Sequence, residues 1–273
     1  MIECLLFTSD PGYGAAAIAS GVAALVVDWE WQGKAVRQAG RATEVNHGTV
    51  DDLVAMRRAT DGRVVCRINN TPGRRGDECR LAIEHGANEI WLPMVRSPRE
   101  LEQCLRAIDG RARLGTMIET REAMRLGREF AQLPLAHAYV GLNDYRIDNG
   151  HRGLFEPMVD GTIDRFRDDY PGALGVAGIT HPDRGSPIPQ RLLLADMVRL
   201  GCTFGVARRG FRADIDAGGI AGGIAAIDRE VARLQARSSA EVASDRAAFA
   251  AAVSRIRSAE AVPRLHAGIA CAS

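Results

Sequence analysis

The segment from residue 89 to residue 119 reads EIWLPMVRSPRELEQCLRAIDGRARLGTMIE and contains one full repeat of the pattern that decides the fold. The runs 89–95 and 113–119 are short and apolar, which is typical of strands that are covered on both faces. Between them, Ser97 is followed by Pro and then Glu, which indicates a helix start, and Gly110 suits the helix end. The segment therefore predicts a strand, a helix and a second strand.

The same alternation continues along the chain. Apolar runs that predict strands lie at 2–8, 23–28, 63–68, 89–95, 113–119, 137–143, 174–180 and 202–207. Eight such repeats favour a closed barrel over an open doubly wound sheet. A dinucleotide-binding GxGxxG motif does not follow the first run, since residues 10–14 indicate only a turn and a helix start. We therefore predict an α/β fold with a (β/α)8 TIM barrel over residues 1–237 as the catalytic domain.

The chain changes character after about residue 214. The Gly-rich stretch 216–223 is expected to be flexible, and it lacks the Lys-Ser/Thr pair of a phosphate-binding P-loop. A helix is expected over 227–237, and spaced apolar positions in 238–260 indicate a second amphipathic helix. Residues 238–273 are therefore predicted to form a C-terminal helical extension and tail, packed on this subunit or at a subunit interface.

The composition excludes several classes of function. Lys and Arg total 35 against 34 Asp and Glu, so the net charge of +1 gives no field that attracts nucleic acid or a membrane surface. The sequence has no apolar run of about 18 residues, and the apolar stretch at its start is too short for a signal peptide. Six cysteines without a CxxC pair are expected to be reduced thiols. We expect a cytoplasmic protein.

Two acids, Glu119 and Asp144, come where consecutive predicted strands end. Reactive groups of such barrels sit at the carboxyl ends of the strands, and neighbouring strands lie about 4.8 Å apart. Two carboxylates suit Mg²⁺ or Mn²⁺, which keep further positions for water and substrate oxygens, whereas the lack of His and Cys at both strand ends disfavours zinc. The alternative is that Glu119 caps the following helix and Asp144 lies in a turn.

Arg67 follows an apolar strand, where an unpaired charge is costly to bury. Its guanidinium is suited to grip a substrate carboxylate or an enolate oxygen with two hydrogen bonds. The alternative is a salt bridge to Asp28 or Glu30, which are two residues apart and share a face if the preceding strand continues through them.

Of the six histidines, His47 and His181 lie near the expected mouth of the barrel. Either is a candidate general base, because imidazole titrates near neutral pH. His85 and His137 are expected to be structural, because one precedes a helix-ending Gly and the other begins a strand.

Five segments, in order over about residues 20–210, carry a resemblance to a known superfamily. They are Val27-Asp28-Trp29-Glu30, Cys66-Arg67-Ile68-Asn69, Leu92-Pro93-Met94-Val95, Met117-Ile118-Glu119-Thr120 and Gly141-Leu142-Asn143-Asp144. In these segments the chain resembles the HpcH/HpaI aldolase and citrate lyase beta-subunit (CitE-like) superfamily.

The resemblance implies a class II, metal-dependent aldolase or carbon–carbon lyase. Mg²⁺ or Mn²⁺, held by Glu119 and Asp144, would stabilise the enolate of pyruvate or a related 2-keto acid. The substrates would be a keto acid and an aldehyde, in a homo-oligomer without nucleic acid or membrane partners. The resemblance places Arg67, Asn143 and Asp144 at the substrate, and the candidate catalytic residues are Arg67, His47, Glu30 and Asp28.

One position departs from the superfamily pattern. Pyruvate aldolases of this kind carry a histidine for proton transfer directly after the acid that is Glu30 here, and this chain has Trp31. Proton transfer would then use another group, such as His47 or a metal-bound water. Two alternatives stay open: a lyase for an acyl-CoA ester of the malyl- or citramalyl-CoA type, and a non-catalytic metal-binding barrel. The arginines that would bind the nucleotide of a thioester are Arg74, Arg75, Arg208 and Arg209, and the favoured alternative is that these four are solvated surface charges.

Overall fold

The computed structural model describes residues 1–31, 48–150, 153–215 and 219–261. Eight parallel strands pair in chain order and close into a barrel, with β1 bonded to both β2 and β8. The strands are β1 (Glu3–Phe7), β2 (Ala24–Asp28), β3 (Arg63–Arg67), β4 (Glu89–Leu92), β5 (Arg113–Ile118), β6 (His137–Val140), β7 (Leu174–Ile179) and β8 (Phe204–Ala207). The predicted (β/α)8 barrel is therefore confirmed, with all eight strands at the predicted apolar runs.

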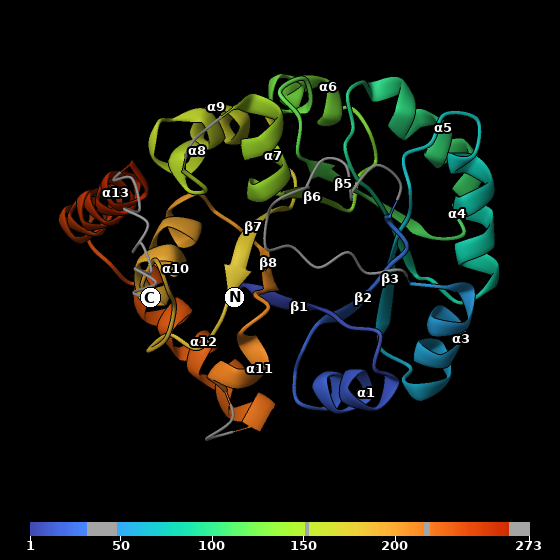
Figure 1. The fold of residues 1–273 in the computed structure, drawn as a ribbon, viewed down its shortest axis with the longest axis horizontal. Helices are drawn as coiled ribbons and strands as arrows, with labels where there is room; N and C mark the ends of the chain where they lie inside the picture. The colour runs from blue at the N-terminus through green and yellow to red at the C-terminus, as the bar shows by residue number, and fades with distance from the viewer. Residues whose placement is uncertain (32–47, 151–152, 216–218, 262–273) are drawn as a thin grey trace, which may run out of the picture.

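Helices surround the barrel as an outer ring (Figure 1). They are α1 (Pro11–Ala19), α3 (Val50–Ala59), α4 (Arg75–Glu84), α5 (Pro98–Ile108), the 3-10 turn η1 (Ala123–Arg125), α6 (Gly127–Phe130), α7 (Leu142–Asn149), α8 (Glu156–Val159), α9 (Thr162–Asp169), α10 (Gln190–Arg199), α11 (Phe211–Asp214), α12 (Gly219–Gln235) and α13 (Ser239–Ala261). One apolar cluster fills the space between the strands and these helices, and a smaller one fills the barrel interior. Strands buried on both faces explain the continuous apolar runs of the sequence.

Two strands end three residues earlier than the sequence predicts, and both differences shape the site. β4 stops at Leu92, because Pro93 has no N–H to donate and Met94 adopts a left-handed backbone with φ of 50°. β6 stops at Val140, because Gly141 is the N-cap of α7. Asp144 therefore lies in the first turn of α7 and not at the end of a strand.

A buried polar cluster around Glu89 lies at the amino-terminal end of the barrel strands, opposite the cavity. Glu89 is fully buried, and its Oε1 lies 2.7 Å from both the Trp91 indole nitrogen and His137 Nδ1. Burial alone would raise the pKa of Glu89, but His137, Trp91 and Arg113 stabilise its carboxylate and hold the pKa below its ordinary value. His137 is structural, as predicted.

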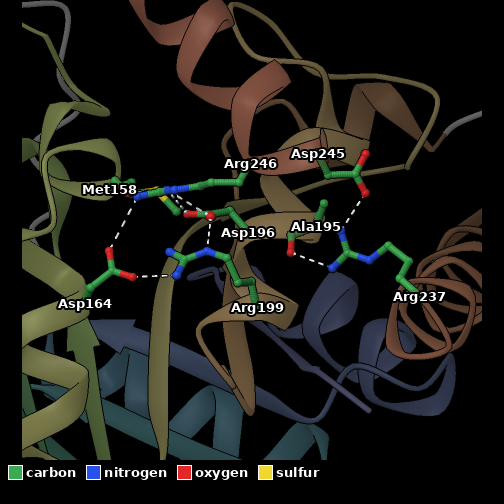
Figure 2. Close-up of polar contacts among 8 residues, drawn as sticks. All are labelled: Met158, Asp164, Ala195, Asp196, Arg199, Arg237, Asp245 and Arg246. Atoms are coloured by element: carbon green, nitrogen blue, oxygen red, sulfur yellow. Dashed lines mark hydrogen bonds and ion pairs between the residues drawn. The ribbon is translucent and has the colours of Figure 1, made fainter. Parts of the chain in front are cut away.

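The C-terminal extension packs on the barrel of its own chain. Helix α13 contacts α10 and α8, and its Phe249 is fully buried. Figure 2 shows how Arg246 of α13 bonds to both oxygens of Asp196 at 2.9 and 3.0 Å and to the Met158 carbonyl, while Arg199 pairs with the same aspartate. A role for this extension at a subunit interface stays a prediction.

The expectation of a flexible Gly-rich stretch over 216–223 is wrong for residues 219–223, which form the first turns of α12, and residues 216–218 lie outside the described residues. Gly223 is buried there, and the helix packs through Ile224 and Ile227, which are 9% and 1% exposed. Tertiary packing of an apolar face thus outweighs the low helix propensity of glycine.

The predicted free thiols are present where the structure describes them. Cys4, Cys66, Cys79, Cys104 and Cys202 are buried and unbridged. In the described ranges of the chain, every helix is too short or too polar to cross a membrane.

Candidate active site

The barrel has a cavity of about 490 Å³ at the carboxyl ends of its strands. Asp28 and Arg67 end β2 and β3, Glu119 directly follows β5, and all three line this cavity with Asn143 and Asp144 of α7. Parallel strands bring their carboxyl ends to one face of the barrel, so residues distant in sequence converge there. Four of the predicted residues for substrate and metal, Arg67, Glu119, Asn143 and Asp144, are therefore brought together.

Arg67 is held by the two acids that the sequence offers as its partners. Its Nε and Nη2 donate to the two oxygens of Asp28 at 2.8 and 2.6 Å, and its Nη1 lies 3.3 Å from Glu30 Oε2. Burial alone would lower the pKa of Arg67, but the carboxylates of Asp28 and Glu30 raise it above its ordinary value. The guanidinium is therefore a permanent positive charge of fixed orientation.

The Arg67 guanidinium also contacts two apolar side chains of the cavity lining, Phe7 and Met117. The guanidinium carbon lies 4.8 Å from the Phe7 ring centroid, and Nη1 lies 3.8 Å from the Met117 sulfur. These contacts hold the charge at the floor of the cavity, where Arg67 is 8% exposed. The predicted salt bridge and a substrate contact are thus compatible, because Arg67 lines the cavity while Asp28 holds it from one side.

Glu119, directly after β5, is buried and only 2% exposed. Burial, and then the negative charges of Asp144 and Glu30, raise the pKa of Glu119 to about 8, against the opposing effects of Arg67 and of the Met94 N–H. That N–H donates to Glu119 Oε2 at 3.1 Å from the left-handed residue of the β4 end. Strained backbone of this kind is typical of functional sites.

Gly141 allows the close approach between Glu119 and the start of α7. A Cβ atom at position 141 would lie 2.4 Å from Glu119 Oε1 and 2.5 Å from its Cγ. Asp144, in the first turn of that helix, is 7% exposed and lines the same cavity. The two carboxylates that the sequence pairs are therefore neighbours, and the repulsion between them disfavours a second negative charge.

The donor set fits a hard divalent cation. Two buried carboxylates that repel each other gain from a cation between them, and Mg²⁺ and Mn²⁺ take few protein carboxylates and complete their shells with other oxygens. Within the described ranges, no group of three or more His, Cys, Asp or Glu side chains is arranged to hold a metal ion. The pair would therefore rely on water and substrate oxygens for the remaining positions.

The two candidate general bases, His47 and His181, are not among the described residues that line the cavity. His47 lies outside the described residues. His181 lies beyond β7 in a separate pocket with Arg191 and Glu230, and its Nδ1 accepts the Asp183 N–H at 3.2 Å. Trp31, at the position where a histidine was expected, is 49% exposed, and its backbone N–H donates to Asn69.

A second wall of the cavity, after β8, is basic. We call Arg208, Arg209 and Arg212 the arginine wall, because all three line the cavity within five residues. Of the other two candidate nucleotide-binding arginines, Arg75 is buried on α4 and bonds to Gln103, and Arg74 precedes that helix.

Two residues of the cavity lining, Tyr139 and Arg212, are not among the predicted site residues. Tyr139 also lines the cavity, from an inward position of β6 two residues after His137. Strand parity would have predicted Tyr139, because alternate residues of a strand face the same side. Arg212 lies three residues after Arg209, and this short spacing would have placed it in the same group of arginines.

No protein-family model and no curated protein sequence matches the chain. Solved structures do share its fold. RipC from Yersinia pestis is 17% identical, with 89% of this chain and 98% of that chain covered and a TM-score of 0.56. A citrate lyase from Burkholderia xenovorans LB400 is 15% identical, with 97% and 94% covered and a TM-score of 0.59.

An HpcH/HpaI aldolase from Desulfitobacterium hafniense DCB-2 is 13% identical, with 80% of this chain and 91% of that chain covered and a TM-score of 0.57. The fold is that of the HpcH/HpaI aldolase and citrate lyase structures. Structures of the superfamily that five short sequence segments indicated are thus among those that share the barrel. At these identities the likeness shows the fold alone, and the chemistry depends on the residues of the cavity.

Proposed function

We propose that this protein is a divalent-metal-dependent carbon–carbon lyase or aldolase that acts on pyruvate or a related 2-keto acid through its enolate. The observation that carries the proposal is the buried pair of Glu119 and Asp144 beside the fixed charge of Arg67 in one cavity. Mg²⁺ or Mn²⁺ bound by the two carboxylates would supply a second positive charge for the oxygen on which the enolate charge develops.

The residues of the cavity divide the work of binding and charge stabilisation. Arg67 presents its guanidinium to the keto acid and stabilises negative charge on substrate oxygens without any reorientation, because Asp28 and Glu30 already hold it. Both Asp28 oxygens bond to Arg67, and Oδ1 also accepts the Glu30 N–H at 3.1 Å. We therefore assign Asp28 and Glu30 to the positioning of Arg67 and not to proton transfer.

Apolar side chains line the rest of the floor. Phe7, Met117 and Val206 keep bulk water from the reacting carbon, which strengthens the interaction of every nearby charge. The residue that transfers the proton stays a prediction: the candidate is His47, which lies outside the described residues.

The test is exchange of the pyruvate methyl protons with solvent deuterium, followed by NMR with and without Mn²⁺ or Mg²⁺. We expect metal-dependent exchange in the unaltered protein and its loss in Glu119→Gln and in Asp144→Asn. Both variants should still unfold in a cooperative thermal transition, which shows that they are folded. The matched control is Glu122→Gln, an acid three residues beyond Glu119 whose side chain is 52% exposed and pairs with Arg96.

Two results would overturn the proposal. Absence of exchange together with cleavage of malyl-CoA would assign the protein to the ester lyases. Manganese binding that depends on Glu119 and Asp144, without turnover of any keto acid or thioester, would indicate a non-catalytic metal-binding barrel.

A further inference from the structure

Tyr139 is a cavity residue to which the proposed chemistry gives no role. It is the next-to-last residue of β6, faces the barrel interior and lines the cavity together with Arg67 and Glu119. Only 9% of the residue is exposed. A phenylalanine would fill the same apolar space, so the packing of the barrel does not explain the hydroxyl.

Aromatic neighbours fix the Tyr139 ring. It stacks on Trp91 with the ring centroids 5.5 Å apart and an interplanar angle of 20°, and it lies 6.2 Å from the Phe204 ring centroid. Trp91 is in turn held by its indole nitrogen, which donates to Glu89 at 2.7 Å. Aromatic pairs of this geometry favour one orientation of both rings. The phenol oxygen of Tyr139 therefore has a fixed position, and only its hydrogen can rotate.

The hydroxyl end of the ring lies toward the charges at the mouth of the cavity. Burial and the negative charge of Glu119 raise the pKa of Tyr139, and the positive charge of Arg67 opposes them. The titrating atom is the phenol oxygen, so both charges act on that end of the side chain. The phenol keeps its proton at neutral pH and can donate a hydrogen bond.

The Tyr139 hydroxyl forms no hydrogen bond with any group in the described ranges of the chain. A buried tyrosine usually bonds its hydroxyl, because an unpaired buried O–H is costly. The charged neighbours have other partners, since Glu119 accepts the Met94 N–H and Arg67 donates to Asp28. The donor is thus open to a molecule that enters the cavity.

We propose that the Tyr139 hydroxyl is a catalytic hydrogen-bond donor to the keto oxygen of the substrate, on which the enolate charge develops. This inference rests on the proposed function, in which the same oxygen is stabilised by Arg67. When a base removes the methyl proton, the C–H electron pair forms the C=C bond of the enolate, and the carbonyl pair moves onto the oxygen. A fixed donor at that oxygen gains strength as the charge grows, so it stabilises the transition state more than the bound ketone.

The other oxygens that such a donor could contact belong to the substrate carboxylate. That group carries its charge before, during and after proton removal, so a hydrogen bond to it would stabilise all states alike and act on KM. A hydrogen bond to the keto oxygen acts on kcat instead. The two positions of the donor therefore differ in their kinetic effect.

The test is Tyr139→Phe, which removes one oxygen and keeps the stacked ring. In the exchange of pyruvate methyl protons with solvent deuterium, we expect kcat to fall about ten- to 100-fold and KM to change less than about threefold. Manganese affinity, followed by electron paramagnetic resonance, should stay unchanged, because Tyr139 is not one of the two proposed ligands. Urea denaturation shows that the variant is folded.

Oxalate binding gives a readout without turnover. Oxalate is planar and carries negative charge on its oxygens, as the enolate of pyruvate does, so it gains from interactions that strengthen in the transition state. Its affinity for the manganese-loaded protein, measured by calorimetry, should fall about tenfold in Tyr139→Phe, because a hydrogen bond to a charged oxygen contributes about that factor.

The matched control is Tyr170→Phe, which removes the same atom from another buried ring. Tyr170 is 2% exposed and follows α9 outside the cavity lining, and its hydroxyl has no hydrogen-bond partner in the described part of the chain. This variant should leave both the exchange rate and the oxalate affinity unchanged.

The outcomes separate this inference from the proposed function. Normal exchange and normal oxalate affinity in Tyr139→Phe would overturn the inference alone, and so would equal losses in Tyr139→Phe and Tyr170→Phe. A raised KM with an unchanged kcat would place the donor at the substrate carboxylate and overturn its assignment to the keto oxygen. Absence of exchange in the unaltered protein would overturn the proposed function and this assignment with it.

Discussion

Replacing Gly141 by alanine isolates the contact between Glu119 and the start of α7. The glycine has φ of −84° and ψ of 84°, so the change places no residue in the left-handed region. The added methyl group would lie 2.4 Å from Glu119 Oε1 and 2.5 Å from Cγ. Ordinary contacts are about 3.5 Å or longer, so the carboxylate must move by about 1 Å.

The expected effect is larger on the site than on the fold. Overpacking of this size costs about 1–3 kcal/mol of stability. A displacement of about 1 Å at a catalytic group costs about 100-fold in rate, and a disturbed metal ligand loses about ten- to 100-fold in metal affinity. Gly141→Ala should therefore bind Mn²⁺ at least about tenfold more weakly and exchange pyruvate protons about 100-fold more slowly.

Manganese titration followed by electron paramagnetic resonance measures the first quantity, and deuterium exchange measures the second. Gly222→Ala is the matched control, because a Cβ atom there meets nothing within 4 Å and the residue lies inside α12. That control should leave both quantities unchanged. Unchanged manganese affinity and exchange in Gly141→Ala would refute the role assigned to this close approach.

Three further predictions concern the base, the barrel floor and the C-terminal helix. His47→Ala should lower the exchange rate about 100-fold if His47 is the general base, and a near-neutral effect would exclude it. The lowered pKa of Glu89 implies stability that is present above its ordinary value of 4.5 and is lost as the pH falls through the lower folded value. Glu89→Gln should therefore flatten the decline of the free energy of unfolding below pH 4.5, and equal declines in urea denaturation would contradict this. Arg246→Gln should lower the free energy of unfolding by about 1.5–3 kcal/mol, because it removes the charged bonds to Asp196, whereas Arg255→Gln on the exposed face of α13 should have little effect.

The strands of the barrel were predictable because burial on both faces leaves a signal within each segment. Every run from β1 to β8 is short and apolar, and its neighbours follow in chain order. Glu119 was predictable for a related reason, since a polar residue directly after such a run lies at the mouth of the barrel. Asp144 was paired with it correctly, although the residue belongs to a helix and not to a strand end.

What the sequence did not predict depends on contacts between distant segments. The left-handed backbone at Met94 is imposed where the chain leaves β4 and turns its N–H toward Glu119. The stacking of Arg212 on Tyr13 joins two residues that are 199 positions apart in the sequence and meet only because β1 and β8 close the barrel. Local propensity carries no information on either contact.

The attachment of α13 bears on the order in which the chain assembles. All eight strands precede residue 208, so the barrel can close during synthesis before α13 exists. Arg199, three residues along α10, already pairs with Asp196 within the barrel, so Asp196 has a cationic partner before α13 packs. Arg246 then adds its hydrogen bonds to the Asp196–Arg199 pair, so α13 can pack against α10 without a rearrangement of that pair.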